Sequence, residues 1–310
     1  MARKERKKVI AYAVETDYGV DAIEALTLGA KPNYLLGREF SITPMAGESS
    51  ELDYDDGRLG NSGEIVTELF VTVEFTVDFA SGGDAATPAP WGELMSACLR
   101  ETQPDDDTAP TQHDYLINDE SEGSLTLYFY QSGVLHKMTG SRGSLSLNVQ
   151  AKNFGGIKFS FSGLFAPVEA ADLPTADFTP WQTPLKIGVE NSAFTIDGES
   201  FKLISMDYDQ ANSVVYQEYV GHEEVLITDF KPTGTIVLEA PKLDESDPFA
   251  MAKAGSKHEL VFTNGPIGNQ VEWSSPEVQF GRPTYADQDG TQTYSIPIIV
   301  IGNSDKFTTR

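Results

Sequence analysis

The chain has 310 residues, of which 40% are hydrophobic, and its formal net charge is −25 at pH 7. This length is enough for about two domains, each able to bury its own core. Residues 1–8 carry five Lys or Arg and one Glu, a net charge of +4, so residues 9–310 carry the remaining −29. Proteins that grip nucleic acid need a basic surface to neutralise phosphates. Specific nucleic-acid binding is therefore disfavoured.

No membrane span or secretory signal is expected from the hydropathy pattern. The chain has no run of about 18 apolar residues, and the basic residues 1–8 are not followed by an apolar stretch. Cys98 is the only cysteine, which excludes an internal disulfide and a multi-thiolate metal site. We therefore expect a chain made in the cytoplasm, with Cys98 as a small core side chain.

The first part of the chain reads as strands around one short helix. We expect residues 1–37 to be a basic tail and a lead-in segment. Apolar and polar residues then alternate over 69–79, which predicts a strand with one core face, and Glu74 and Asp78 lie on its polar face. A helical segment at 91–99 follows, and then strands near 125–130, 144–151 and 157–162. The last two strands flank the turn at 153–156 and predict a hairpin with a small, hydroxylated outer face.

The same order returns after a proline-rich stretch. Residues 166–193 hold four prolines and predict an extended linker. A strand at 235–240, a helix at 248–254 and strands near 259–263, 270–280 and 293–301 follow. Asp247 is placed to cap this second helix, and Pro248 occupies its first position.

The repeated order predicts two tandem copies of one domain, at residues 38–165 and 194–310. Placing Ala97 on Ala254 also places Leu94 on Met251, at an offset of 157 residues. The expected fold is mainly β, with two β-sandwich or partial-barrel units that are each flanked by a short α-helix. Duplicated domains often supply pseudo-equivalent positions in a closed ring.

Each expected unit contains a long polar segment, at residues 44–64 and 207–224. Neither segment has an obvious strand pattern, and such long loops in compact domains are usually functional or ordered by a partner. We expect them to reach a neighbouring subunit. The residues proposed for this contact are Asp53, Asp55, Asp56, Tyr216 and Tyr219.

Enzymatic signals are weak, and we expect neither catalysis nor a cofactor. The chain lacks a G-x-S-x-G elbow, a P-loop and a dinucleotide-binding glycine pattern. Its four histidines are scattered without metal-ligand spacing. The 47 acidic residues allow many carboxylate pairs but single out none.

An ordered set of segments resembles the tail tube (major tail) proteins of long, non-contractile tailed bacteriophages, the siphovirus type. The matching segments are residues 59–63, 89–94, 125–130, 133–143 and 225–229, so the resemblance spans about residues 38–280. It implies a β-sandwich or partial barrel with one helix, whose sheets join between subunits into a tube through which DNA leaves the capsid. Some members have one such fold per chain and form six-membered rings.

With two tail-tube-like units per chain, three chains would supply a pseudo-sixfold ring. The resemblance implies a virion tail protein that is assembled in the host cytoplasm. It also implies partners, namely further copies of the chain, the tape measure protein in the lumen, the tail tip and the terminator. Genomic DNA would pass through the lumen transiently and without specific binding. We expect Glu74 and Asp78 to line an acidic lumen, because carboxylates hold phosphates away from the wall. Ring packing is expected around Trp91, Leu94 and Met251.

A carbohydrate-binding or carbohydrate-cleaving β-sandwich is the alternative. The acidic composition, twelve tyrosines and three tryptophans are compatible with sugar recognition but do not specify it. Only Trp273 falls within an expected strand, so it is the residue on which a sugar platform would depend.

Overall fold

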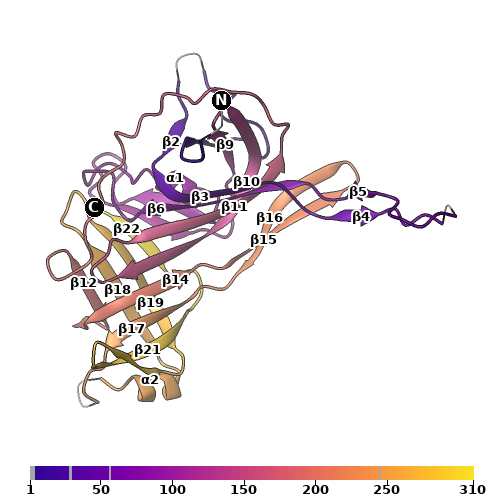
Figure 1. The fold of residues 1–310 in the computed structure, drawn as a ribbon. Helices are drawn as coiled ribbons and strands as arrows, with labels where there is room; N and C mark the ends of the chain where they lie inside the picture. The colour runs from indigo at the N-terminus through magenta and orange to yellow at the C-terminus, as the bar shows by residue number, and fades with distance from the viewer. Residues whose placement is uncertain (1–3, 28–29, 56, 244–245) are drawn as a thin grey trace.

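The computed structural model describes residues 4–27, 30–55, 57–243 and 246–310. Over these described residues, strands make up 52% and helices 4%, and the sheets are open. The prediction of a mainly β fold with two short helices is confirmed. Figure 1 shows the N-terminal half (indigo to magenta) beside the C-terminal half (orange to yellow), with two projections that extend to the same side.

Seven strands of the N-terminal half pair in one antiparallel series. From edge to edge they are β3 (Gly37–Ala46), β6 (Phe70–Asp78), β11 (Gly156–Phe165), β10 (Val134–Gln150), β9 (Leu125–Gln131), β1 (Lys8–Val14) and β2 (Asn33–Leu35). The helix α1 (Gly92–Ser96) follows β6 in the chain. The lead-in segment at 1–37 thus contributes two strands to the first sheet.

Seven strands of the C-terminal half pair in a corresponding series. In order they are β14 (Leu203–Asp209), β17 (Thr233–Glu239), β21 (Thr291–Val300), β19 (Val271–Phe280), β18 (Lys257–Asn264), β12 (Ser192–Ile196) and β13 (Glu199–Ser200). The helix α2 (Pro248–Ala254) follows β17, as α1 follows β6. Each strand of one series has a counterpart at the same place in the other.

Three elements distinguish the halves. A hairpin of β7 (Arg100–Pro104) and β8 (His113–Ile117) follows α1, and the C-terminal half has β20 (Thr284–Gln288) between β19 and β21. The last strand, β22 (Lys306–Thr309), pairs with β8 on one side and β19 on the other. The end of the chain therefore binds the two halves together.

One sheet also crosses from the first half to the second. Residues 146–150 of β10 pair with residues 205–209 of β14, which joins the two series. Eight strands then follow one another in the order β3, β6, β11, β10, β14, β17, β21 and β20. We call this the eight-stranded sheet.

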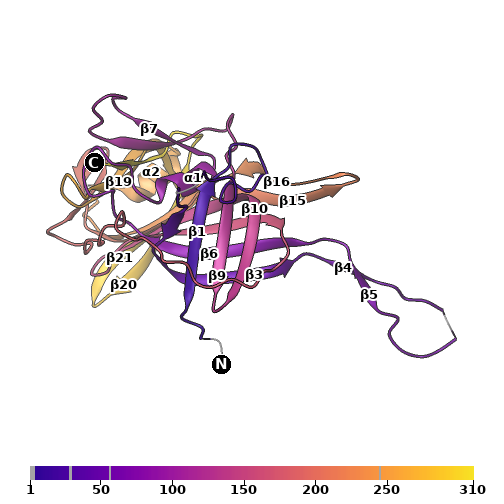
Figure 2. The same cartoon turned by 90° about the horizontal axis from the view of Figure 1, so that it is seen from above.

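The two projections arise at corresponding places, between β3 and β6 and between β14 and β17. The first arm, residues 47–69, carries the short strands β4 (Ser49–Glu51) and β5 (Glu64–Val66). The second arm, residues 210–232, is a hairpin of β15 (Asn212–Tyr219) and β16 (His222–Phe230). The expectation that residues 207–224 lack strand character is wrong. None of the β15 residues is fully buried and its apolar residues Val214, Val215 and Tyr216 are consecutive, so no alternation marks this strand in the sequence. Figure 2 shows both arms extending from the same side.

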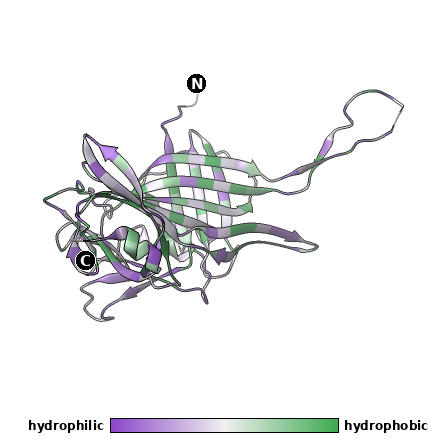
Figure 3. Ribbon diagram, turned by 90° about the horizontal axis from the view of Figure 1, so that it is seen from below, coloured by the Kyte–Doolittle hydropathy of each residue, from purple (hydrophilic) through white to green (hydrophobic). Residues whose placement is uncertain are grey.

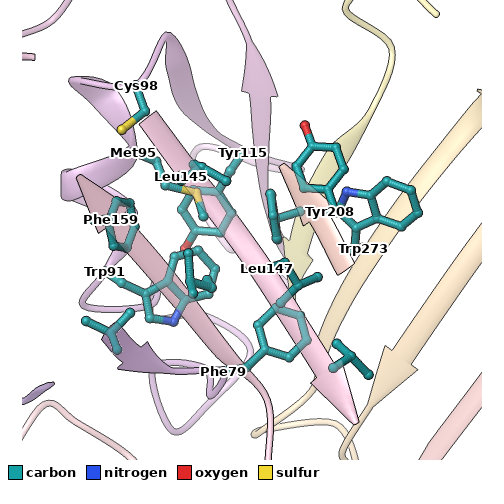
Figure 4. Close-up of a cluster of buried hydrophobic side chains, with 14 of the residues drawn as sticks. Phe79, Trp91, Met95, Cys98, Tyr115, Leu145, Leu147, Phe159, Tyr208 and Trp273 are labelled. Carbon is teal, nitrogen blue, oxygen red and sulfur yellow. The ribbon is translucent and has the colours of Figure 1, made fainter. Parts of the chain in front are cut away.

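A single hydrophobic core spans both halves. The alternation predicted for residues 69–79 is confirmed, since Val71, Val73, Phe75 and Val77 are all at most 2% exposed. Figure 4 shows Tyr208 and Trp273 of the C-terminal half beside Leu145 and Tyr115 of the N-terminal half. Figure 3 shows hydrophobic and hydrophilic residues side by side along the strands, as expected for sheets with one buried face.

Candidate assembly surfaces

The outer face of the eight-stranded sheet is polar across both halves. The register places Thr76, Lys158, Ser146, Asp209 and Thr233 side by side on five successive strands. Side chains of the opposite parity, such as Val77, Ile157, Leu147 and Tyr208, are buried in the core. We call this outer face of the sheet the polar face. A hollow on it is lined by residues of both halves, including Asn148, Lys158 and Asp207.

Carboxylates outnumber cations on the polar face. Its acidic residues on β3, β6 and β14 are Glu39, Glu74, Asp78, Asp207 and Asp209, and its cations on β3 and β11 are Arg38 and Lys158. The Glu74 carboxylate forms an ion pair with Lys158 Nζ at 2.9 Å, and both side chains are about half exposed. The face is therefore net acidic and hydrated.

Asp78 lies less openly than Glu74. Its Oδ1 is 3.6 Å from Arg38 Nη2, and its side chain is 32% exposed. Burial raises the pKa of Asp78, and the nearby Arg38 guanidinium opposes that rise. Both predicted lumen residues thus lie on the polar face.

Sequence reasoning missed Asp207 and Asp209 as residues of the polar face, because it placed both in the long polar segment 207–224. They belong to β14, where Asn148 Nδ2 donates a hydrogen bond to Asp207 Oδ1. The alternation of Met206 and Tyr208 with these two aspartates is a strand signal that could have identified them.

The predicted ring-packing residues have different environments. Trp91 and Leu94 are 0% exposed and pack inside their own chain, where Trp91 Nε1 donates to Ala80 O at 2.7 Å. They therefore cannot contact a neighbouring chain directly and would act only by positioning α1. Met251 of α2 is partly buried and remains available at the surface.

α2 has the ends predicted for it. Asp247 accepts hydrogen bonds from the backbone N–H groups of Phe249 and Ala250, and Pro248 opens the helix. Gly255 ends it in the left-handed conformation, with a φ of 64°. These caps hold a two-turn helix whose apolar side, Phe249 and Met251, is only partly covered.

The tips of both arms carry exposed apolar side chains. Tyr54, Leu59 and Ile65 of the first arm and Tyr219 and Val220 of the second are at least 55% exposed. Apolar groups gathered on projecting segments are typical of protein-binding surfaces. The second arm contacts β6 directly after the first arm, where the Phe70 and Tyr216 rings stack with centroids 5.1 Å apart.

Of the residues proposed for contacts between rings, Asp53 and Asp55 are exposed in the first arm, and Asp56 lies outside the described residues. Tyr216 is fixed within the second arm, since its hydroxyl donates to Glu223 Oε2 at 2.9 Å. Burial and this carboxylate partner raise the pKa of Tyr216. Tyr219, which is 60% exposed, is freer to meet a neighbour.

A family profile described as phage tail tube protein matches residues 5–298. The chain belongs to the phage tail tube protein family. A search of curated proteins gives no match.

A buried polar cluster joins the halves of this tail tube protein. Arg100 at the start of β7 pairs with Asp305 near the C-terminus at 2.5 Å, and both side chains are 0% exposed. Tyr208 Oη donates to Asp305 at 2.7 Å, and Arg100 Nε donates to Gln210 Oε1 at 2.7 Å. Desolvation lowers the pKa of Arg100, but the neighbouring Asp305 and Tyr208 outweigh it, so that the pKa is raised and the guanidinium stays charged.

The sugar-platform reading of Trp273 fails in this tail tube protein. Its side chain is 0% exposed and lies 5.1 Å from the Tyr208 ring, centroid to centroid, so it cannot stack on a ligand. Within the described ranges, no group of three or more His, Cys, Asp or Glu is arranged to hold a metal ion. None of the helices described is long and apolar enough to cross a membrane.

Proposed function

We propose that this tail tube protein is a tandem duplication, three copies of which form one pseudo-sixfold ring, and that such rings stack into the tail tube. The matched strand order of the two halves carries this proposal. The repeats we infer are residues 8–165 and 192–300, because β1 and β12 occupy corresponding places. These repeats begin at residues 8 and 192, earlier than the domain starts expected from the sequence, which were residues 38 and 194.

The internal joint between the halves supports a ring. β14 continues the first half's sheet, so two units already share one polar face within a single chain. Repetition of such a joint around an axis would close the sheet and place one face inside. The core side cannot be that face, because it is filled by buried side chains.

We propose that the polar face lines the lumen. A conduit for duplex DNA works best when its wall does not bind phosphate, since each Lys or Arg contact releases counterions and favours adhesion. The carboxylates of Glu74, Asp78, Asp207 and Asp209 repel phosphates instead. The tape measure protein would occupy this lumen before the DNA, and the protein would act without catalysis.

The arms are proposed to connect successive rings. They project from the same side of both halves, and each ends in exposed apolar side chains. In a ring of three chains, six arms would face one neighbouring ring. The tail tip and terminator proteins would meet the two end faces of the stack.

Electron microscopy of the protein at high concentration or in the tail, with symmetry left free, tests the proposal. Stacked rings with true threefold and apparent sixfold symmetry are expected. Six chains in each ring would contradict the proposed tandem duplication but would leave the proposed tube function intact. A protein that never assembles, even beside its tail partners, would overturn the tube.

The arms can be tested separately. Replacing residues 52–63 with Asn-Gly should give a short hairpin on the strands of the first arm and a folded chain that forms rings but few stacks. Tubes formed at the rate of the unmodified protein would contradict the assignment of the first arm to stacking.

A further inference from the structure

The eight-stranded sheet has two unpaired edges. β3 pairs only with β6, and β20 pairs only with β21, among the strands that the structure describes. All five residues of β20 are exposed. Unpaired strand edges present N–H and C=O groups that readily pair with another chain.

The outward groups of β20 can be assigned from its turn. Asp289 and Gly290 form a two-residue turn with φ of 52° and 82°, and Gln288 and Thr291 flank it. In such hairpins the flanking pair exchanges hydrogen bonds, and successive residues then alternate between inward and outward. The N–H groups of Tyr285 and Asp287 therefore point away from β21.

The internal joint shows what each edge fits. β14 is the counterpart of β3, since each precedes an arm and pairs with the strand that follows that arm. In the joint, the edge of β14 that faces away from β17 pairs with residues 146–150 of β10. The free side of β3 has no such partner within the described part of the chain.

β20 is the counterpart of the covering segment. β10 pairs with β9 through its first part and with β11 through its last part. In the C-terminal half, two separate strands make the pairings that β10 makes alone. β19 pairs with β18, and β20, which follows residues 281–283, pairs with β21. β20 thus corresponds to the part of β10 that holds β14.

The helices show the same relation. In the internal joint, the end of the α1 segment holds the base of the second arm, because Gln210 Nε2 and Asn212 Nδ2 both donate to Cys98 O, at 2.6 Å and 3.3 Å. Beside β20, Phe249 of α2 packs on Tyr285, with ring centroids 5.6 Å apart. Tyr285 is nevertheless 63% exposed, so this aromatic cluster lacks the cover that the base of an arm would give.

We propose that β20 of one chain pairs antiparallel with β3 of a second copy, and that Phe249, Met251 and Tyr285 pack against the base of the second copy's first arm. This head-to-tail contact rests on the proposed tube function and names its ring interface. The polar faces of the two edges match. Ala286 lies on the same face as Ser295 of β21, and Thr43 lies on the same face as its β6 partner Thr72. Pairing of these edges therefore continues the polar face without interruption.

The contact also gives the width of the ring for a chosen number of copies. Eight strands from each of three chains make a 24-stranded ring. With strands about 4.8 Å apart and tilted by about 40°, the opposite backbones would be about 48 Å apart. Two copies would give a sixteen-stranded ring about 32 Å across, which would leave a narrower channel.

A proline on the outer edge of β20 tests the contact. Asp287→Pro removes one outward N–H and leaves the bonds to β21, whereas Asp287→Ala loses the same carboxylate and keeps the N–H. We expect the Pro variant to remain folded by circular dichroism and to lose at least tenfold in ring yield, while the Ala variant assembles normally. Ring formation by the Pro variant at the unmodified level would overturn the proposal.

Disulfide trapping tests the partner strand directly. Ala286→Cys is combined in turn with Ser41→Cys, Thr43→Cys or Met45→Cys, all exposed positions on β3, while the native Cys98 is buried. One pair should give covalent dimers and trimers in assembled tubes, since bridged residues have Cα atoms about 4.4–6.8 Å apart. Tubes in which no pair cross-links would overturn the β20–β3 contact but keep the tube function, whereas absence of any ring by the unmodified protein would overturn both.

Discussion

The helices α1 and α2 occupy corresponding places but have different surroundings. Around α1, Trp91 packs on Tyr115 of β8 with centroids 4.8 Å apart and on Phe307 of β22 at 6.4 Å. No counterpart of the β7–β8 hairpin follows α2, where Phe249 and Met251 remain partly covered. The same helix position is therefore completed within the chain in one half and left open in the other. This difference separates residues that stabilise the monomer from residues that serve assembly.

The largest stability loss should come from the closed side. We expect Trp91→Ala to lower the free energy of unfolding by about 3–5 kcal/mol, because it opens a cavity in a fully buried site. Urea unfolding monitored by circular dichroism measures the loss. A cost below about 1 kcal/mol would mean that the surroundings of α1 are not the completed core described above.

The buried cluster between the halves should come next. Arg100→Met leaves the Asp305 carboxylate buried without its cation, and we expect it to cost about 3 kcal/mol. The double variant Arg100→Met with Asp305→Leu should recover much of that loss, since neither charge is then left unpaired. If the double variant is no more stable than the single one, the charged pair has no special part in joining the halves.

On the open side, Phe249→Ala should cost only about 1 kcal/mol in the isolated chain, because its side chain is partly exposed there. If α2 meets a second copy, the same change should raise the protein concentration needed for ring formation by about tenfold, which corresponds to about 1.4 kcal/mol. Sedimentation over a concentration series measures that threshold. An unchanged threshold would remove Phe249 from the ring contact and narrow the difference between the helices.

Alternation and capping signals were enough to predict α2 and strands in the ranges of β6, β9, β11, β17, β18, β19 and β21 and the second part of β10. The core positions of residues 69–79 and the Asp247 cap follow from local chemistry that is visible in a short window of sequence. The second arm was missed because β15 has no fully buried residue and its apolar residues are consecutive, so no alternating apolar face marks the strand. The pairing of β10 with β14 and of β22 with β8 joins residues far apart in the chain, and no local pattern encodes such contacts.

The site residues show the same limit. Glu74 and Asp78 were assigned to the polar face of their strand, where the structure also has them, because that strand alternates clearly. Trp91 and Leu94 were placed at a subunit contact although they are core residues, since an apolar residue at a helix start can serve either role. Only the tertiary neighbours Tyr115 and Phe307 distinguish the two roles, and they come from later parts of the chain.

The smallest expected effect compares the two predicted lumen carboxylates. Burial raises the pKa of Asp78 in the folded chain, so its ionised form is disfavoured there relative to the unfolded chain. The stability that belongs to the protonated group is present at low pH and is lost as the pH rises through the folded-state pKa. Asp78→Asn should therefore stabilise the chain at pH 7 by less than about 1 kcal/mol, after allowance for the group's partial exposure.

The advantage of Asp78→Asn should shrink as the pH falls toward the usual aspartate range, where the native carboxyl also becomes neutral. Glu74→Gln is the matched control, because Glu74 shares the strand and the face but is about half exposed and paired with Lys158. Its substitution should change stability by no more than a few tenths of a kcal/mol. Carbon-13 titration of Asp78 gives the second measurement, and a midpoint at or below the ordinary aspartate value would contradict the assigned burial. Because both changes remove one negative charge from the polar face, a difference between them reports the burial of Asp78 rather than the overall electrostatic field of that face.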